Sequence, residues 1–249
     1  MARNLVRSLG AQARLDPDDL VQRHLAWFRS GPPDVGTVTR LVLERAAGGE
    51  PAPEAARAVW MQRGPEVSAG NGSVMYCAPL GVAYANRPDE LFELAPLLSS
   101  ITHHDERCAT ACLAVTLVAA AIVRGDAPEG SLREAVTSFL DREGGEELEY
   151  LIEVAGSVRP VDGPDRGFCL YAAALGLQSV LRGDDYQDGM RRVVALGGDT
   201  DTNAAVTGAL LGARDGASAL PEGWLERLQD RDEIEREAEG LAELAKRRP

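Results

Sequence analysis

Residues 197–205 read GGDTDTNAA, which places two carboxylates and a hydroxyl between a glycine pair and a run of small helix-forming residues. Within one helix Asp199 and Asp201 would point about 200° away from each other. They can converge only where the chain turns into a helix, and the glycine pair supplies the backbone freedom for that turn. Oxygen ligands without Cys or His nearby favour Mg²⁺ or Mn²⁺ over Zn²⁺. An aspartate helix cap beside a turn residue is the simpler alternative.

The helix expected next, over 201–213, carries small side chains on two stripes that recur every four residues: Ala204, Gly208 and Gly212, and Ala205, Ala209 and Ala213. Small side chains let neighbouring helices approach closely. We therefore expect an all-α fold. The glycine pair and the residues up to Thr202, which we call the acidic turn, should lie deep inside it, where a rigid metal site is favoured.

Helical patterns also cover most of the remaining sequence. Asp16 and Pro17 mark a helix start, and a second helix is expected from Thr37 to about Ala47, before a glycine pair. Further helices are expected at 53–62, 75–85, 89–101, 105–124, 131–142, 146–156, 168–182, 185–195 and 231–247. Pro79 predicts a kink or a later start in the 75–85 helix. No segment alternates as a strand does, so we expect a single all-α domain over residues 1–249.

Composition narrows the class of partner and the compartment. A net charge of −13 argues against binding to a DNA or RNA backbone. The longest apolar run, 108–123, falls short of the roughly 20 residues of a membrane span, so a buried central helix and no membrane contact are expected. The N-terminus lacks the apolar core of a signal peptide. The four cysteines have no CxxC spacing, which predicts buried thiols in a reducing cytoplasm.

Two loops are candidates for binding an anionic ligand. Residues 70–73 read GNGS, and glycine N–H groups before a helix start that Ser73 can cap suit an anion, although an ordinary turn is the alternative. Residues 101–105 read ITHHD, in which Asp105 can cap the central helix. His103 would then lie on the loop before it, either near a phosphate or as a surface or capping residue.

Three segments, in this order, resemble the ADP-ribosylglycohydrolase family: GNGS at 70–73 followed by APLG at 78–81, ITH at 101–103, and GGDTDTNAAVTGALLGA at 197–213. Trp27 and DVGT at 34–37 also match the early region of that family. The resemblance covers roughly residues 15 to 215, and GGDTDT with its small-residue helix is its specific part.

The resemblance implies an orthogonal multi-helix bundle whose central cleft holds Mg²⁺ or Mn²⁺. Such enzymes hydrolyse the glycosidic bond that joins ADP-ribose to a side chain, so ADP-ribose or an ADP-ribosylated protein is the expected partner. By position, Asp199, Asp201 and Thr202 would be metal ligands. The substrate-binding residues would be Ser68, Gly70, Asn71, Gly72 and Ser73, with His103 near the diphosphate.

The sequence departs from the family at its beginning. The family's Gly-Asp-Ala-Leu-Gly-like helix and its Thr-Asp-Asp-Thr motif, which supplies the other metal ligands, are not found here. We expect an incomplete version of a metal-dependent hydrolase, with a weak or single-ion metal site. One alternative is a non-catalytic module that binds ADP-ribose or a protein. Another is an oligomer in which a second chain supplies the missing carboxylates.

Overall fold

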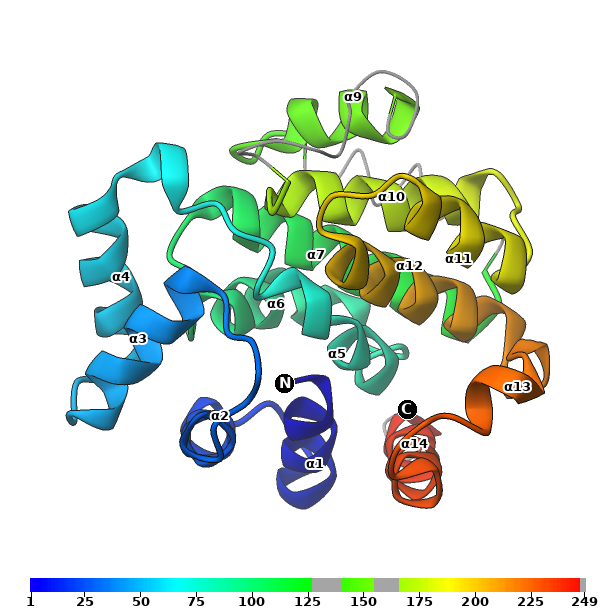
Figure 1. Cartoon of the computed structure of the whole chain (residues 1–249), viewed down its shortest axis with the longest axis horizontal. Coiled ribbons are helices and arrows are strands. Elements are labelled where there is room, and N and C mark those ends of the chain that lie inside the picture. The colour runs from blue at the N-terminus through cyan, green and yellow to red at the C-terminus, as the bar shows by residue number, and fades with distance from the viewer. Residues whose placement is uncertain (127–139, 155–165, 247–249) are drawn as a thin grey trace.

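The computed structural model describes residues 1–126, 140–154 and 166–246. Every regular element in these ranges is an α or a 3-10 helix, and the described part of the chain contains no strand. One isolated antiparallel bridge joins Gly70 to Phe168. The prediction of an all-α fold is therefore confirmed (Figure 1).

Helix α7 (Glu106–Arg124) is the centre of the fold, and nearly all of its side chains are buried. The helices that pack on it are α5 (Ala78–Ala83), α6 (Leu91–Ser100), α9 (Gly145–Val154), α10 (Cys169–Leu181) and α12 (Thr200–Asp215). Helix α11 (Tyr186–Ala195) packs on the outer side of α12. Although α7 is long and apolar enough to cross a membrane, 83% of its apolar window is buried inside the protein. The predicted buried central helix is thus confirmed.

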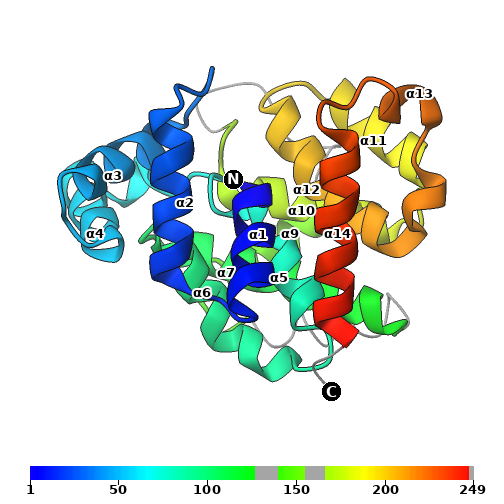
Figure 2. The ribbon, with the colours of Figure 1, turned by 90° about the horizontal axis from the view of Figure 1, so that it is seen from below.

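Six further α-helices surround this core: α1 (Ala2–Gln12), α2 (Pro17–Arg29), α3 (Thr37–Ala47), α4 (Ala52–Arg63), α13 (Glu222–Leu225) and α14 (Arg231–Lys246). Figures 1 and 2 show α1 and α14 side by side beneath α5, and α3 and α4 as an antiparallel pair at one end. Single 3-10 turns are η1 (Pro65–Val67), η2 (Val74–Tyr76), η3 (Pro88–Glu90) and η4 (Ala217–Ala219).

Helix α1 is the one long helix that the sequence pattern does not predict. Its N-cap position is Met1, and no side chain caps it. Its stability comes from tertiary contacts instead, because Leu5 and Leu9 are fully buried. Arg7 also pairs with Glu237 of α14 at 2.6 Å. A helix that depends on a partner distant in sequence leaves little local signal.

The other helix predictions agree with the structure to within a few residues. Asp16 caps α2 by accepting from the Asp19 backbone N–H at 3.1 Å, and Asp105 caps α7 in the same way. The 75–85 helix is divided into η2 and α5, with Pro79 in the first turn of α5. The helix predicted over 131–142 lies almost wholly outside the described residues, as does the end of the 146–156 helix.

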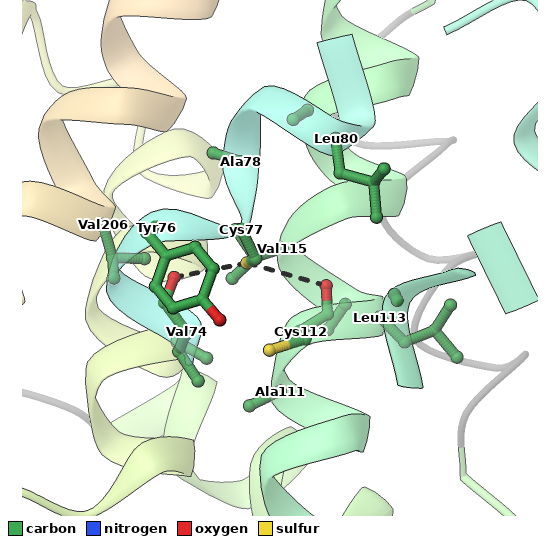
Figure 3. Packing of buried hydrophobic residues seen from close by; sticks show 14 of the residues in the cluster. Val74, Tyr76, Cys77, Ala78, Leu80, Ala111, Cys112, Leu113, Val115 and Val206 are labelled. Carbon is green, nitrogen blue, oxygen red and sulfur yellow. Dashed lines mark hydrogen bonds between the residues drawn. The ribbon is translucent and has the colours of Figure 1, made fainter. Parts of the chain in front are cut away.

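We call residues 70–73 the glycine loop. The core next to it is made of closely packed small and apolar side chains. Figure 3 shows Tyr76 and Cys77 of this region between Val206 of α12 and Cys112 and Val115 of α7. All four cysteines are free and buried, as predicted. This packing fixes the start of α12 relative to the segment after the GNGS loop.

Small residues of α12 do permit a close approach, but to α11. A Cβ atom on Gly208 would lie 3.1 Å from the sulfur of Met190 and 3.4 Å from the hydroxyl of Tyr186. The approach of α10 to α12 depends instead on Gly176 of α10, where a Cβ would meet Val206 at 3.0 Å. The stripes predicted from α12 therefore account for one of its two close neighbours.

Candidate functional site

The acidic turn begins with two glycines in the left-handed region, Gly197 at φ 77° and Gly198 at φ 71°. Asp199 follows at the N-cap position of α12, but its carboxylate caps no helix N–H. It accepts a hydrogen bond from the side-chain amide of Asn71 instead, at 2.7 Å between Nδ2 and Oδ2. The simpler alternative of an aspartate cap is therefore wrong for Asp199, and the carboxylate faces the glycine loop.

Several backbone hydrogen bonds fix the position of Asn71. Its N–H donates to the carbonyl of Gly167 at 2.9 Å, and its own carbonyl accepts from the Met75 N–H at 3.1 Å. One residue earlier, Gly70 forms the isolated bridge with Phe168. A Cβ on Gly167 would lie 3.5 Å from Oδ2 of Asp199, so this backbone lies directly beside the carboxylate. Three segments that are distant in sequence thus meet at one point.

Within the described residues, no basic side chain compensates the charge of the acidic turn. Burial raises the pKa of Asp199, and the neighbouring carboxylate of Asp201 raises it further, against hydrogen bonds from Asn71 and Thr202. No arginine or lysine within the described ranges forms an ion pair with either aspartate. Two facing carboxylates and a hydroxyl form an oxygen donor set that fits a hard divalent cation. A bound cation would remove the repulsion that raises the pKa.

The donor set is small. No group of three or more His, Cys, Asp or Glu side chains gathers anywhere in the part of the chain that the structure describes. Asp199, Asp201 and Thr202 are therefore the three side chains at the turn that could offer oxygen ligands to such a cation.

The predicted depth of the acidic turn is wrong. Thr202 is buried, but Asp199 is only partly buried and Asp201 is exposed. The physical reason is the register of α12, whose buried face consists of Thr202, Asn203, Val206, Thr207, Leu210 and Leu211. The core contacts begin only at the second residue after Thr200, so the turn itself emerges at the surface.

His103 lies behind the glycine loop. A Cβ on Gly72 would lie 2.7 Å from Cε1 of His103 and 2.9 Å from Oγ1 of Thr39, so only glycine fits there. The ring nitrogen Nδ1 of His103 is 2.9 Å from the hydroxyl of Thr102. Burial lowers the pKa of His103 to about 4, so the ring is neutral at pH 7. Any role of this ring near a diphosphate would rest on hydrogen bonding and shape.

The two serines of the predicted site are used within the protein. The Ser68 hydroxyl donates to the carbonyl of Gly64 at 2.6 Å. The Ser73 hydroxyl lies 3.0 Å from that of Ser99 and accepts from the thiol of Cys112. Ser73 does not cap the helix that follows, contrary to the prediction. Both side chains are buried, so they shape the loop from within.

Three residues that contact the glycine loop were not among the predicted site residues. Gly167 and Phe168 pair with the glycine loop, yet they carry no charge or motif that marks them in a single sequence. Thr39 of α3 reaches the loop from the DVGT region, and only its position after Thr37 hinted at a place near the site.

Comparison with known proteins identifies the family and the fold. The sequence model of ADP-ribosylglycohydrolase matches residues 1–249. An ADP-ribosyl-[dinitrogen reductase] glycohydrolase of Rhodospirillum rubrum is 28% identical over 98% of this chain and 78% of its own length. The ADP-ribosylarginine hydrolase Tri1 of Serratia proteamaculans is 23% identical over 98% of this chain and 66% of its own.

A solved structure, described as an ADP-ribosylglycohydrolase-related protein complex, superposes with a TM-score of 0.78 at 35% sequence identity. The match covers 98% of this chain and 79% of the other. The family match spans the whole chain, and the solved structure shares its fold. The chain belongs to the ADP-ribosylglycohydrolase family.

Proposed function

We propose that this hydrolase cleaves the glycosidic bond between ADP-ribose and a protein side chain, with Mg²⁺ or Mn²⁺ bound at the acidic turn. The observation that carries the proposal is the 2.7 Å contact between Asn71 and Asp199, which joins the glycine loop to the acidic turn. The names of the relatives, an ADP-ribosyl-[dinitrogen reductase] glycohydrolase and an ADP-ribosylarginine hydrolase, support an ADP-ribosylated protein as substrate.

The acidic turn has the chemistry for the metal-binding half of such a site. A divalent ion held there would supply electrostatic stabilisation of developing negative charge. Asp199 and Asp201 would hold it with their carboxylates, and Thr202 with its hydroxyl. Asn71 keeps the Asp199 carboxylate oriented by donating to one oxygen, so that the carboxylate does not have to reorganise when the ion arrives.

The glycine loop has the chemistry for the substrate half. The backbone of Gly70 and Gly72 lies against the neutral ring of His103, and at Gly72 the ring leaves no space for a side chain. Backbone N–H groups in such a loop suit an anionic or polyhydroxyl ligand, which is the chemistry of ADP-ribose. The four buried free thiols support a reducing compartment, and we place the protein in the cytoplasm on that ground.

Release of ADP-ribose from a peptide carrying ADP-ribosylated arginine tests the proposal. We expect hydrolysis in the presence of Mg²⁺ or Mn²⁺, loss of hydrolysis in EDTA, and loss in Asp201→Asn. Asp18→Asn is the matched control, because Asp18 is also an exposed aspartate in the first turn of a helix. Equal activity in EDTA, or equal losses in both variants, would contradict a metal-dependent site at the acidic turn.

A second candidate function is ADP-ribose binding without hydrolysis. The small donor set favours it, because no third acidic or imidazole ligand joins Asp199 and Asp201 within the described residues. This function predicts that wild-type protein binds ADP-ribose equally well with Mg²⁺ and with EDTA, and that no peptide substrate is turned over.

A further inference from the structure

A cluster of polar and aromatic side chains at the start of α7 contacts both the loop that leads to GNGS and the 167–168 segment. It consists of Trp60 on α4 and Asp105 and Arg107 at the start of α7. The Asp105 side chain is only 2% exposed and pairs with Arg107 at 2.8 Å between Oδ1 and Nε. Trp60 donates its indole N–H to the other carboxylate oxygen at 3.0 Å. We call these three residues the clamp.

The clamp contains a buried charge, the carboxylate of Asp105, which the guanidinium of Arg107 and the indole N–H of Trp60 compensate. Burial raises the pKa of Asp105, but hydrogen bonds from Arg107 and Trp60 outweigh that effect and lower the pKa below its usual value. The guanidinium binds the carboxylate through two nitrogens, since Nη2 also lies 2.9 Å from Oδ2. A two-point contact of this kind holds the arginine plane in one orientation.

Arg107 then contacts both segments that position Asn71. Its Nη2 donates to the carbonyl of Pro65 at 2.6 Å, at the start of the loop that leads to GNGS. Its guanidinium carbon lies 5.7 Å from the centre of the Phe168 ring, within the range of a cation–π contact. Phe168 is paired with Gly70, and the residue before it accepts the hydrogen bond from the Asn71 N–H.

We infer that Arg107 is a positioning residue, which holds the 65–70 loop and the 167–168 segment in register and so fixes Asn71 against Asp199. The inference rests on the proposed function insofar as it predicts an effect on ADP-ribose. Arg107 acts on Asn71 through the two segments that it contacts, at Pro65 and at Phe168. Trp60 and Asp105 orient its guanidinium.

Lysine cannot replace arginine in this role. An ammonium group is a point charge that can satisfy Asp105 or Pro65 but does not present a planar fork to both. Arg107→Lys should therefore keep the charge while releasing the loop. The matched control is Arg23→Lys, because Arg23 forms a similar two-nitrogen pair with Asp19 on α2 at 2.6 Å and 3.3 Å.

Amide hydrogen exchange on the ligand-free protein tests the clamp independently of any activity. In Arg107→Lys we expect faster exchange at the Asn71 and Cys169 amides, which bond to Gly167 and Ala69, and no change in helix α12. Arg23→Lys should leave these amides unchanged. Unchanged exchange at both amides in Arg107→Lys would overturn the inference, whether or not the protein binds ADP-ribose.

Calorimetry with ADP-ribose and Mg²⁺ then tests the consequence for the site. We expect the Kd to rise about tenfold in Arg107→Lys, which corresponds to about 1.4 kcal/mol. In an Asn71→Ala background the same change should have almost no further effect, because the route through Asn71 is already broken. Additive effects in the two backgrounds would overturn the inference. A lack of ADP-ribose binding in wild-type protein would contradict the proposed function instead, and the exchange experiment would still decide the clamp.

The turnover rate separates positioning from loss of folded protein. A variant that only unfolds more easily has fewer active molecules, which lowers the maximal rate but leaves KM unchanged. Arg107→Lys should raise KM. Trp60→Phe removes one hydrogen bond to Asp105 and keeps the charge, so it should shift KM in the same direction by a smaller factor. A lower maximal rate with an unchanged KM in both variants would overturn the positioning role.

Discussion

The glycine loop and the acidic turn are both glycine-rich segments that lead into a helix, but their polar groups are treated in opposite ways. In and around the glycine loop, Ser68, Ser73 and His103 are buried and hydrogen-bonded within the protein. In the acidic turn, Asp199 and Asp201 face each other with no ion-pair partner in the described part of the chain. The glycine loop is preorganised by its internal hydrogen bonds, whereas the acidic turn leaves carboxylate oxygens available to a ligand.

This comparison explains why the Asn71–Asp199 hydrogen bond is informative. It is a direct side-chain link between the glycine loop, whose neighbouring polar side chains are hydrogen-bonded within the protein, and the acidic turn, whose carboxylates have no ion-pair partner in the described residues. A rigid loop can hold a carboxylate in place at little cost in ordering, and the remaining oxygens stay available to a ligand.

The largest effect is expected from Asp199→Asn. Removal of this carboxylate should reduce hydrolysis at least about 100-fold, because a metal ligand is lost. Since its pKa is raised in the fold, the ionised form of Asp199 destabilises the metal-free protein at neutral pH. The variant should therefore be at least as stable as wild type in thermal unfolding with EDTA. A clear loss of stability would show that the turn is as saturated as the glycine loop.

A second effect concerns the pH dependence of the free energy of unfolding, to which the buried histidine behind the glycine loop contributes. Burial lowers the pKa of His103 to about 4 and that of His24 to about 3, below the usual value of 6.5. Their neutral forms are favoured in the fold, so this stability is present above about pH 6.5 and is lost as pH falls towards 4. Denaturant titrations should show a loss of up to about 1.4 kcal/mol per pH unit for each group. In His103→Gln that slope should fall by about half; an unchanged slope would show that His103 is not held neutral.

A third effect comes from the fit of Gly72. A methyl group there would lie 2.7 Å from the His103 ring, so Gly72→Ala should cost about 2 kcal/mol of unfolding free energy through overpacking. Gly70→Ala is the matched control, because its Cβ would lie 3.4 Å from the same ring. Chemical denaturation measures both variants, and equal stabilities would mean that the loop is not closely packed on His103.

The smallest effect is expected from Asn71→Asp, which adds an uncompensated carboxylate to the glycine loop beside the acidic turn. A third carboxylate beside Asp199 should cost about 1 kcal/mol without metal, because like charges in one site disfavour ionisation. Added Mg²⁺ should raise the melting temperature of this variant more than that of wild type. Asn71→Ala serves as the neutral control, and an equal response to Mg²⁺ in both variants would contradict a cation at the turn.

Much of the fold follows from local sequence signals, and the parts that do not share one cause. Caps such as Asp16 and Asp105 and the break at Pro79 are written in neighbouring residues, so those helices could be predicted. Helix α1 could not, because its arginine pairs with α14 act over more than 200 residues of sequence.

The site shows the same limit. The GGDTDT and GNGS segments stand out by composition, but their contact through Asn71 and Asp199 spans 128 residues and required the structure. The depth of the turn was predicted wrongly, because the small residues of α12 indicate close packing without indicating which face is buried. Arg107 carried no motif at all, because the two contacts that single it out, with Pro65 and Phe168, are with segments distant in sequence.

One measurement tests the central claim most directly: calorimetric titration of ADP-ribose into the 249-residue chain, first with saturating Mg²⁺ and then with EDTA. The account predicts binding that requires Mg²⁺ and disappears in Asp201→Asn, because the acidic turn is completed by a cation. Binding of equal strength in EDTA and in Asp201→Asn would contradict it, and the acidic turn would then have no part in holding the ligand.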